Sequence, residues 1–320
     1  MSQPRKHHYL PQFYLRELSF DQRSLYRIEK RTSAVVCASI KDLAAIRDFH
    51  RINHHDTSDP FELEKKLAEI EGALSDALKR VLKDGIPDLQ SHTRIVELVS
   101  LLRFRVPAIK FGIESSLRHV VRTTQLLLAG SGKMPPPPKG LEVALQFDRR
   151  NFEITNWICL KFMFKLAGDR DILRVLLSMR PTLVRAAAGS SFLTCDQPVA
   201  VYSPAAKRGD AYGVALVDSA VEISLPLSRS TLLLLTWRSS LNEVQADSAT
   251  VAEYNRRTIV MADTYVFAAQ VDDMVLRMVN AHRLHRAGIE APEVVDLGES
   301  VLHKLVFRPV LPPEQYEPAV

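Results

Sequence analysis

Apolar positions near the start of the chain follow first a helical and then an alternating pattern. Pro11 suits the first position of a helix, and the apolar residues that follow it up to position 18 predict a short helix. Residues 24–29 and 34–39 alternate apolar and polar side chains around a charged, turn-like segment. This alternation predicts a β-hairpin.

Apolar residues at helical spacing dominate the next part of the chain. Over residues 60–82 apolar side chains recur every three or four positions, and Gly85 ends the pattern. A second apolar stripe over residues 95–117 predicts a long helix that kinks at Pro107. Residues 130–140 contain consecutive prolines, which cannot join a helix, so we predict a surface connector there.

After the connector the pattern changes from helices to strands and back. Helical spacing is seen over residues 152–166 and 171–188, and it returns over 248–270 and 274–285. Between these pairs of helices lie short, turn-bounded segments rich in apolar and β-branched residues, which indicate an antiparallel sheet. The predicted strands span residues 191–193, 199–202, 211–217, 221–226 and 230–237.

Together these elements predict an α+β fold. The expected arrangement is an N-terminal helix and β-hairpin, a central helical layer, and a mostly antiparallel sheet closed by a C-terminal helix. The 320 residues are predicted to form a single domain, with a helical lobe at about 60–188 and a β-rich lobe at about 1–50 plus 190–310.

Composition narrows the class of protein. Hydrophobic residues make up 46% of the chain and charged residues 25%, values that exclude disordered and fibrous classes. The net charge of +5 is spread along the chain, so nucleic acid is permitted as a partner without being indicated. The three cysteines are widely separated, no secretory signal is seen, and no apolar run approaches the roughly 20 residues of a membrane span. We therefore expect a cytoplasmic protein without a membrane partner.

The chain opens with a dense run of polar and aromatic residues, His7-His8-Tyr9-Leu10-Pro11-Gln12-Phe13-Tyr14-Leu15-Arg16. This run is similar to the signature of a bacterial, uncharacterised group, domain-of-unknown-function family 4238. Later blocks also resemble the family, among them Arg105-Val106-Pro107, Ser191 to Val199 and the helix containing Asn255. The resemblance covers nearly the whole chain and implies no established activity.

One family block differs in this chain. Around Asp196 the family pattern usually has Ser before the acid and Asn after it, whereas this chain has Cys195 and Gln197. Cys195 is therefore a poor candidate for a nucleophile.

The sharpest candidate site is His7, His8, Gln12 and Arg16. If a helix begins near Pro11, Gln12 and Arg16 share one face, and the histidines lie beside the helix N-terminus. Arg16 would then bind a phosphate or carboxylate through two hydrogen bonds, and a histidine would donate or accept a proton. The alternative is structural: Gln12 and Arg16 tie the segment to the sheet, and the histidines are merely hydrogen-bonded.

Asp196 is the second catalytic candidate, because it lies at the tip of an apolar strand pair, with Thr194 beside it as a ligand-binding candidate. The carboxylate could bind a metal ion or orient His8, or it could form an Asx-turn with its own backbone. Arg105 and Asn255 are further ligand-binding candidates. Their structural alternatives are a buried ion pair for Arg105 and a link between helix and sheet for Asn255.

Two histidine groups have spacing that resembles a metal site, His54-His55-Asp56 and His282-x-x-His285, but neither has a convincing fourth ligand. We predict that the histidines of both groups lie on the surface. No sequence motif of a nucleotide-binding loop, a serine hydrolase or a zinc protease occurs.

The leading functional hypothesis is a hydrolase of a phosphate-containing substrate, in the form of a metal-dependent phosphodiester hydrolase or nuclease. Nucleic acid or another phosphate-bearing ligand would be the partner, and Mg²⁺ or Mn²⁺ the cofactor. The alternative is a non-catalytic binding or regulatory module, such as a phage-defence component. The sequence identifies neither the metal ligands nor the oligomeric state.

Overall fold

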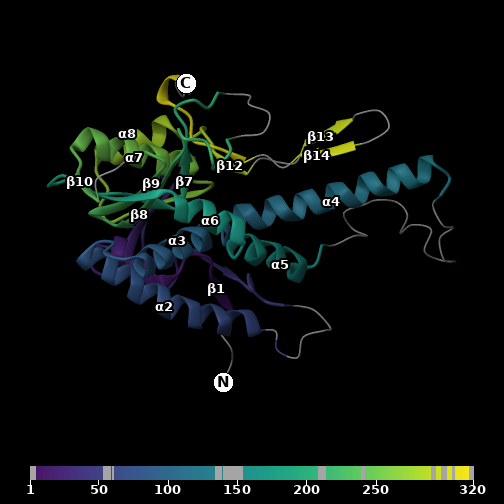
Figure 1. Cartoon of the computed structure of the whole chain (residues 1–320), viewed down its shortest axis with the longest axis horizontal. Helices are drawn as coiled ribbons and strands as arrows, with labels where there is room; N and C mark the ends of the chain where they lie inside the picture. Colours follow the sequence, from purple (N-terminus) through teal and green to yellow (C-terminus); the bar gives the residue numbers. More distant parts are fainter. Residues whose placement is uncertain are drawn as a thin grey trace.

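The computed structural model describes residues 5–52, 59, 61–133, 139, 154–207, 214–238, 242–289, 293–296, 301–304 and 307–316. Within these residues, helices pack on mainly antiparallel sheets, which confirms the predicted α+β class. In Figure 1, helices α7 (Ser248–Met261) and α8 (Asp273–Ala281) lie on one side of the larger sheet, and α2 (Glu62–Asp84) and α3 (Leu89–Phe104) lie on the other.

The larger sheet has five strands in the order β10-β5-β9-β8-β7. β10 runs parallel to β5, and the other neighbours are antiparallel. Its strands are β5 (Arg180–Arg185), β7 (Ala200–Tyr202), β8 (Glu222–Ser228), β9 (Thr231–Thr236) and β10 (Glu243–Gln245). Nearly every side chain of β8 and β9 is buried, because helices cover both faces, so these strands read as continuous apolar runs.

A second sheet joins two strands near the N-terminus to two strands from the second half of the chain, in the antiparallel order β3-β2-β11-β6. Its strands are β2 (Ser24–Glu29), β3 (Val35–Ser39), β6 (Thr194–Cys195) and β11 (Tyr265–Ala268). The pairing of β2 with β3 confirms the predicted hairpin. Because β11 lies between β2 and β6, residues that are remote in sequence become neighbours.

The opening segment is held against this sheet. Strand β1 (Lys6–His8) pairs with β4 (Ala45–Arg47), and helix α1 (Gln12–Leu18) follows directly. The short helix buries Tyr14, Leu15 and Leu18, which confirms the helix predicted after Pro11.

The helical layer consists of α2, α3, α5 (Asn156–Ala167) and α6 (Arg170–Ser178). α2 buries only one stripe of its surface, as an amphipathic helix should, whereas α3 is buried on almost every side from Ile95 onward. Gly85, with a φ of 77°, ends α2, and the Asp88 side chain accepts from the Ser91 N–H to begin α3. One large apolar core spans these helices and the sheet.

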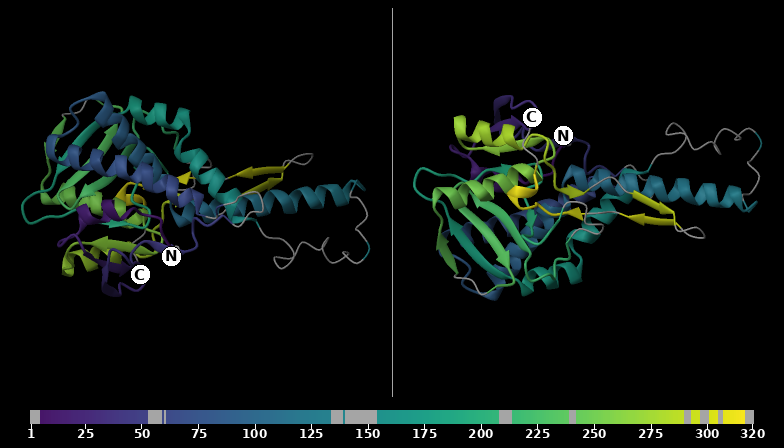
Figure 2. Two further views of the ribbon diagram at one scale, coloured as in Figure 1. Left: turned by 90° about the horizontal axis from the view of Figure 1, so that it is seen from below. Right: turned by 90° about the horizontal axis from the view of Figure 1, so that it is seen from above.

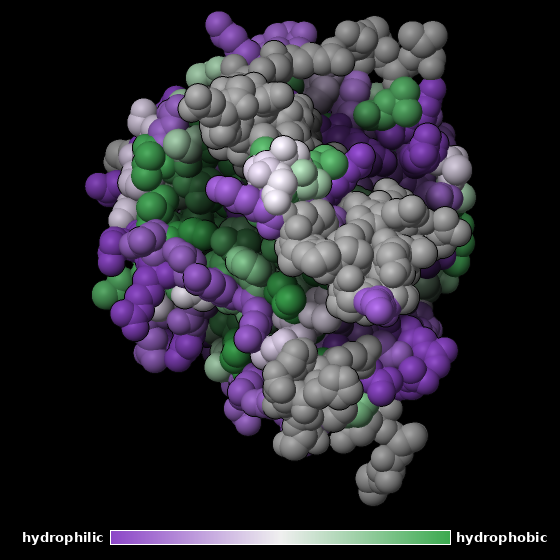
Figure 3. Space-filling view, turned by 90° about the vertical axis from the view of Figure 1, so that its right-hand side faces the viewer, coloured by the Kyte–Doolittle hydropathy of each residue, from purple (hydrophilic) through white to green (hydrophobic). Residues whose placement is uncertain are grey.

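Helix α4 (Pro107–Gly130) extends away from the body, with the hairpin of β13 (Glu293–Asp296) and β14 (Val301–Lys304) along it (Figures 1 and 2). Its base packs tightly on β12 (Gly288–Ile289), which pairs with β15 (Phe307–Arg308). Seen from the projecting end, green apolar surface is exposed between hydrophilic side chains (Figure 3). The exposed large apolar side chains of α4 and α5 include Phe111, Leu126, Leu127, Ile158 and Phe162.

Three helix predictions were wrong in extent. The stripe over residues 95–117 is two helices, since α3 ends before Arg105 and Pro107 starts α4, where its missing N–H costs nothing. Residues 180–185 and 265–268, predicted as helix ends, are strands β5 and β11. Both segments are rich in β-branched or aromatic residues, and available sheet edges outweighed the helical spacing.

Two predicted strands also failed, since residues 191–193 and the described part of 211–217 are irregular. Residues 152–153, 211–213 and His54-His55-Asp56 lie outside the described residues. Within the described part of the chain, no helix is both long and apolar enough to span a membrane.

Candidate functional site

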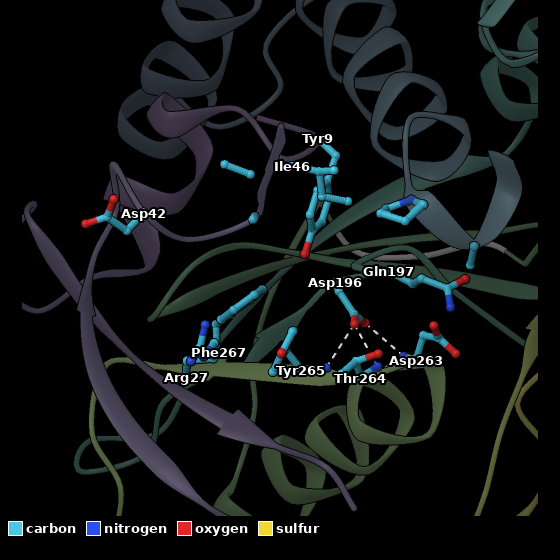
Figure 4. Close-up of a pocket in the computed structure, with 14 residues that line it drawn as sticks. Tyr9, Arg27, Asp42, Ile46, Asp196, Gln197, Asp263, Thr264, Tyr265 and Phe267 are labelled. Carbon is cyan, nitrogen blue, oxygen red and sulfur yellow. Dashed lines mark hydrogen bonds between the residues drawn. The ribbon is translucent and has the colours of Figure 1, made fainter. Parts of the chain in front are cut away.

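A hollow of about 340 Å³ lies where the opening segment meets the loop before β11. Figure 4 shows Tyr9 reaching down into it from one side, Asp196 and Gln197 at its base, and Arg27 at its rim. Two further hollows, of about 250 and 530 Å³, share Ala108 with it and add Arg286 to the lining. We call these three adjoining hollows the groove.

Strand pairing explains why Asp196 lies at the groove. β6 and β11 are antiparallel, with Cys195 opposite Val266, so the residue that follows β6 lies beside the loop that precedes β11. The Asp196 carboxylate accepts from the backbone N–H of Asp263 (2.8 Å), Thr264 (2.7 Å) and Tyr265 (2.8 Å). These bonds reach a distant loop, so they do not form the predicted Asx-turn.

The Asp196 carboxyl is 5% exposed, and burial raises its pKa from 3.8 to about 6. The three backbone N–H groups act in the opposite direction, because they stabilise the ionised form. Desolvation outweighs them. Asp196 therefore exchanges its proton close to neutral pH at the base of the groove, which is where a general acid or base is effective.

Two polar side-chain groups in the groove have no hydrogen-bond partner among the described residues. Tyr9 is 5% exposed, and its hydroxyl points toward Asp196 in Figure 4. Gln197 is 6% exposed, and its amide also lines the groove. Both groups face the hollow, so both are available to bind a ligand or water there.

The pairing of charged groups leaves one cation of the groove available to an anionic ligand. Each acid has its own partners: Asp42 pairs with Lys6, Asp263 lies 3.5 Å from Arg286, and Asp196 has three N–H donors. Arg27 lies over the Tyr265 ring at 4.9 Å and has no carboxylate partner among the described residues.

The start of α4 offers a further donor to such a ligand. The helix has 24 residues, no side chain caps it, and the N–H of Ala108 in its first turn has no acceptor within the described chain. An uncapped helix N-terminus carries partial positive charge and free donors. Because Ala108 lines all three hollows, this end of α4 faces the groove.

The structure places His7 in a different cluster, behind Tyr9 and Phe49. His7 is 1% exposed, and its Nδ1 accepts from the backbone N–H of His50 at 2.9 Å. His50 Nδ1 is hydrogen-bonded to Glu64, and burial lowers the pKa of His50 to about 4. Arg105 completes this cluster, donating from Nε to His50 Nε2 at 3.4 Å.

Arg105 makes the buried ion pair that its sequence alternative described. It is 2% exposed, pairs with Glu71, and donates to the His8 carbonyl at 2.7 Å. The His8 imidazole itself is half-buried, and burial lowers its pKa. Neither side chain lines the groove.

Arg16 and Gln12 lie elsewhere again. Arg16 donates to Gln12 Oε1 at 3.2 Å, so the two share a helix face as expected. Arg16 lines an exposed hollow of about 340 Å³ together with Arg185 and Arg229. The structure thus does not bring His8, Arg16 and Asp196 to one cavity.

Thr194 and Asn255 are engaged in structural contacts. The Thr194 hydroxyl lies 2.8 Å from the Tyr14 hydroxyl. Asn255 accepts from the Leu193 N–H at 2.8 Å and donates to the Ser191 carbonyl at 2.9 Å, which links α7 to the segment before β6. These contacts match the structural alternative for Asn255.

Sequence reasoning missed Tyr9, Arg27 and the start of α4, and named Gln197 only as a departure from the family pattern. A signal was present for Tyr9 only in its place inside the opening signature, two residues after His7. Arg27 and Ala108 carried no such signal, because only the tertiary arrangement brings them to the groove.

Comparison with known proteins identifies one family. The model of a family described as "Protein of unknown function (DUF4238)" matches residues 6–129 and 161–272. This confirms the resemblance seen in the opening signature. No curated protein and no solved structure matches the chain.

Proposed function

Since the DUF4238 family, to which the chain belongs, is one of unknown function, we propose a function from the groove alone: the chain binds a small phosphate-bearing molecule there. The observation that carries the proposal is a set of donors in the groove that have no hydrogen-bond acceptor among the described residues. They are the Tyr9 hydroxyl, the Gln197 amide, the Arg27 guanidinium and the Ala108 N–H. A hollow of about 340 Å³ is of the size that small ligands occupy.

Phosphate fits these donors better than a neutral ligand does. An arginine presents a planar fork that binds two phosphate oxygens at once, and a helix N-terminus offers N–H groups to a third. Arg286 and Arg308 line the adjoining hollow beside Asp263, so a substrate with more than one phosphate would meet further arginine side chains there.

The test is calorimetric titration with inorganic phosphate, pyrophosphate and a nucleoside triphosphate. Arg27→Ala should weaken binding of at least one probe by about tenfold or more, because it removes charge-assisted hydrogen bonds worth about 1.5 to 3 kcal/mol. Arg16→Ala is the matched control, since Arg16 lines a separate hollow, and it should leave the affinity unchanged. If no probe binds, or if only Arg16→Ala weakens binding, the groove is not the phosphate site.

Hydrolysis of that ligand is the second candidate function, and Asp196 favours it. Its carboxyl, with a pKa of about 6, stands opposite the Tyr9 hydroxyl across the hollow. Such a carboxyl could activate water while the hydroxyl stabilises or protonates the leaving group. A phosphodiester hydrolase or nuclease assisted by Mg²⁺ or Mn²⁺ is the form of this activity that we propose.

Turnover is tested with nucleic acids, nucleotides and small phosphodiesters in the presence of Mg²⁺ or Mn²⁺. Tyr9→Phe should lower kcat by about 10² or more, whereas binding should weaken by no more than about tenfold, the loss expected from one neutral hydrogen bond. A wild-type protein that binds phosphate and turns over nothing would instead identify a non-catalytic binding or regulatory module.

A further inference from the structure

A second polar cluster, separate from the groove, is formed by side chains that metal ions prefer. His7, His50 and Glu64 each offer one ligand atom, and these three atoms lie within 4.8 Å of one another. The two imidazole rings are stacked, with centroids 5.7 Å apart, and both Nδ1 atoms face Glu64. We propose that His7, His50 and Glu64 bind one divalent transition-metal ion.

The distances suit an ion of this kind. His7 Nδ1 lies 3.5 Å from Glu64 Oε1. Around a four-coordinate ion with bonds of about 2.1 Å, neighbouring ligand atoms lie about 3.4 Å apart. His50 and Glu64 lie closer because they share a hydrogen bond, and an ion that replaces the shared proton would move them apart.

The donor set also selects the class of metal. Two imidazole nitrogens and one carboxylate suit Zn²⁺, Fe²⁺, Mn²⁺ or Co²⁺, whereas Mg²⁺ and Ca²⁺ prefer oxygen ligands alone. Three protein ligands leave at least one coordination position for water or a further molecule, as in catalytic rather than structural zinc sites.

Access and charge also suit an ion at this place. The side chain of Glu64 is 32% exposed, so an ion could enter from that side. Arg105 pairs with Glu71, and Glu64 has no lysine or arginine partner among the described residues, so the negative charge of Glu64 is available to a cation.

Binding would rearrange three contacts. His7 Nδ1 accepts from the His50 backbone N–H at 2.9 Å, and because this nitrogen has a single lone pair, it would release that N–H to bind the ion. The hydrogen bond between His50 Nδ1 and Glu64 would be replaced by a bond from each side chain to the metal. With its Nδ1 on the metal, His50 carries its proton on Nε2, which faces the Arg105 Nε–H at 3.4 Å. Two donors cannot share that contact, so Arg105 would move away from the ring. It would keep its partners Glu71 and the His8 carbonyl.

The experiment uses the full chain without an affinity tag, stripped of metal and titrated with Co²⁺. We expect one bound Co²⁺ per chain, visible absorption bands of a low-coordinate site, and displacement by Zn²⁺. Glu64→Gln should weaken binding by about tenfold or more, since it removes an anionic ligand. Glu62→Gln is the matched control, because Glu62 lies on the same helix and pairs with Lys66 outside the cluster.

Another histidine pair must be separated from this one. His282 and His285 approach within 2.8 Å through their Nδ1 atoms and could capture an added ion. His282→Gln should therefore retain the Co²⁺ spectrum. The proposal is overturned if the wild-type chain retains no ion after gel filtration, if folded Glu64→Gln binds as the wild type does, or if His282→Gln alone abolishes binding. Circular dichroism and melting curves establish that each variant is folded.

Discussion

Arg105→Ala is expected to lower the free energy of unfolding by about 3 to 5 kcal/mol, as measured by urea denaturation. The guanidinium is 2% exposed and holds Glu71, the His8 carbonyl and His50 together. Alanine would leave a carboxylate and a buried carbonyl without their donor. A loss of this size exceeds the typical effect of a point substitution and would report on the junction between α3, α2 and the opening strand.

A second buried arginine provides the control for Arg105. Arg103 is 9% exposed and lies 4.2 Å over the Phe307 ring, but its Nε and Nη1 have no hydrogen-bond partner among the described residues. Arg103→Met keeps most of the apolar packing and should cost less than about 1 kcal/mol. Equal losses in the two variants would mean that packing, and not the ion pair, determines the effect.

Asp196→Ala is expected to lower the free energy of unfolding by about 3 kcal/mol or more, because three partly buried backbone N–H groups lose their acceptor. Asp196→Asn should cost about half as much, since an amide oxygen still accepts while the amide nitrogen faces one of the donors. Asp263→Asn is the control and should change stability by less than about 1 kcal/mol, because the Asp263 side chain is exposed and its pairing with Arg286 is long. Thermal or urea unfolding measures all three.

The same carboxyl gives a pH dependence with a defined sign. The pKa of Asp196 is raised on folding from 3.8 to about 6, so the folded chain holds this proton more tightly than the unfolded chain. Its contribution to stability is therefore complete below about pH 4 and is lost as the pH rises to about 6. Asp196→Asn should lack this part of the pH profile, and a variant with the wild-type profile would contradict the assignment.

Secondary structure could be predicted where a segment shows a single clear period of apolar residues. The hairpin of β2 and β3 and the helix α2 have clear periods of two and of three to four residues, and both appear where expected. Strands β5 and β11 could not be predicted, because Arg180–Arg185 and Tyr265–Ala268 follow directly on helices and join sheets whose other strands are distant in sequence. The pattern of apolar residues within a segment does not show which distant strand will pair with it.

The candidate site was predictable only in part, for a related reason. The sequence drew attention to the opening signature and to Asp196, and both do contribute to the groove, through Tyr9 and through the acid itself. Charge and proton-transfer chemistry singled out Arg16, whose helix face turns it to another hollow. Which arginine lines the same hollow as Asp196 depends on the register of β2 beside β11, where Arg27 is paired with Phe267.

The origin of the groove's walls has a consequence for how this protein would respond to what it binds. Tyr9, Ala108 and Gln197 come from three distant stretches of chain, and they meet only when β1, α4 and β6 have all docked. A ligand that contacts all three residues has no comparable binding site in the denatured chain. Ligand binding therefore stabilises the native state, and the protein becomes more resistant to unfolding and to proteolysis as the ligand concentration rises.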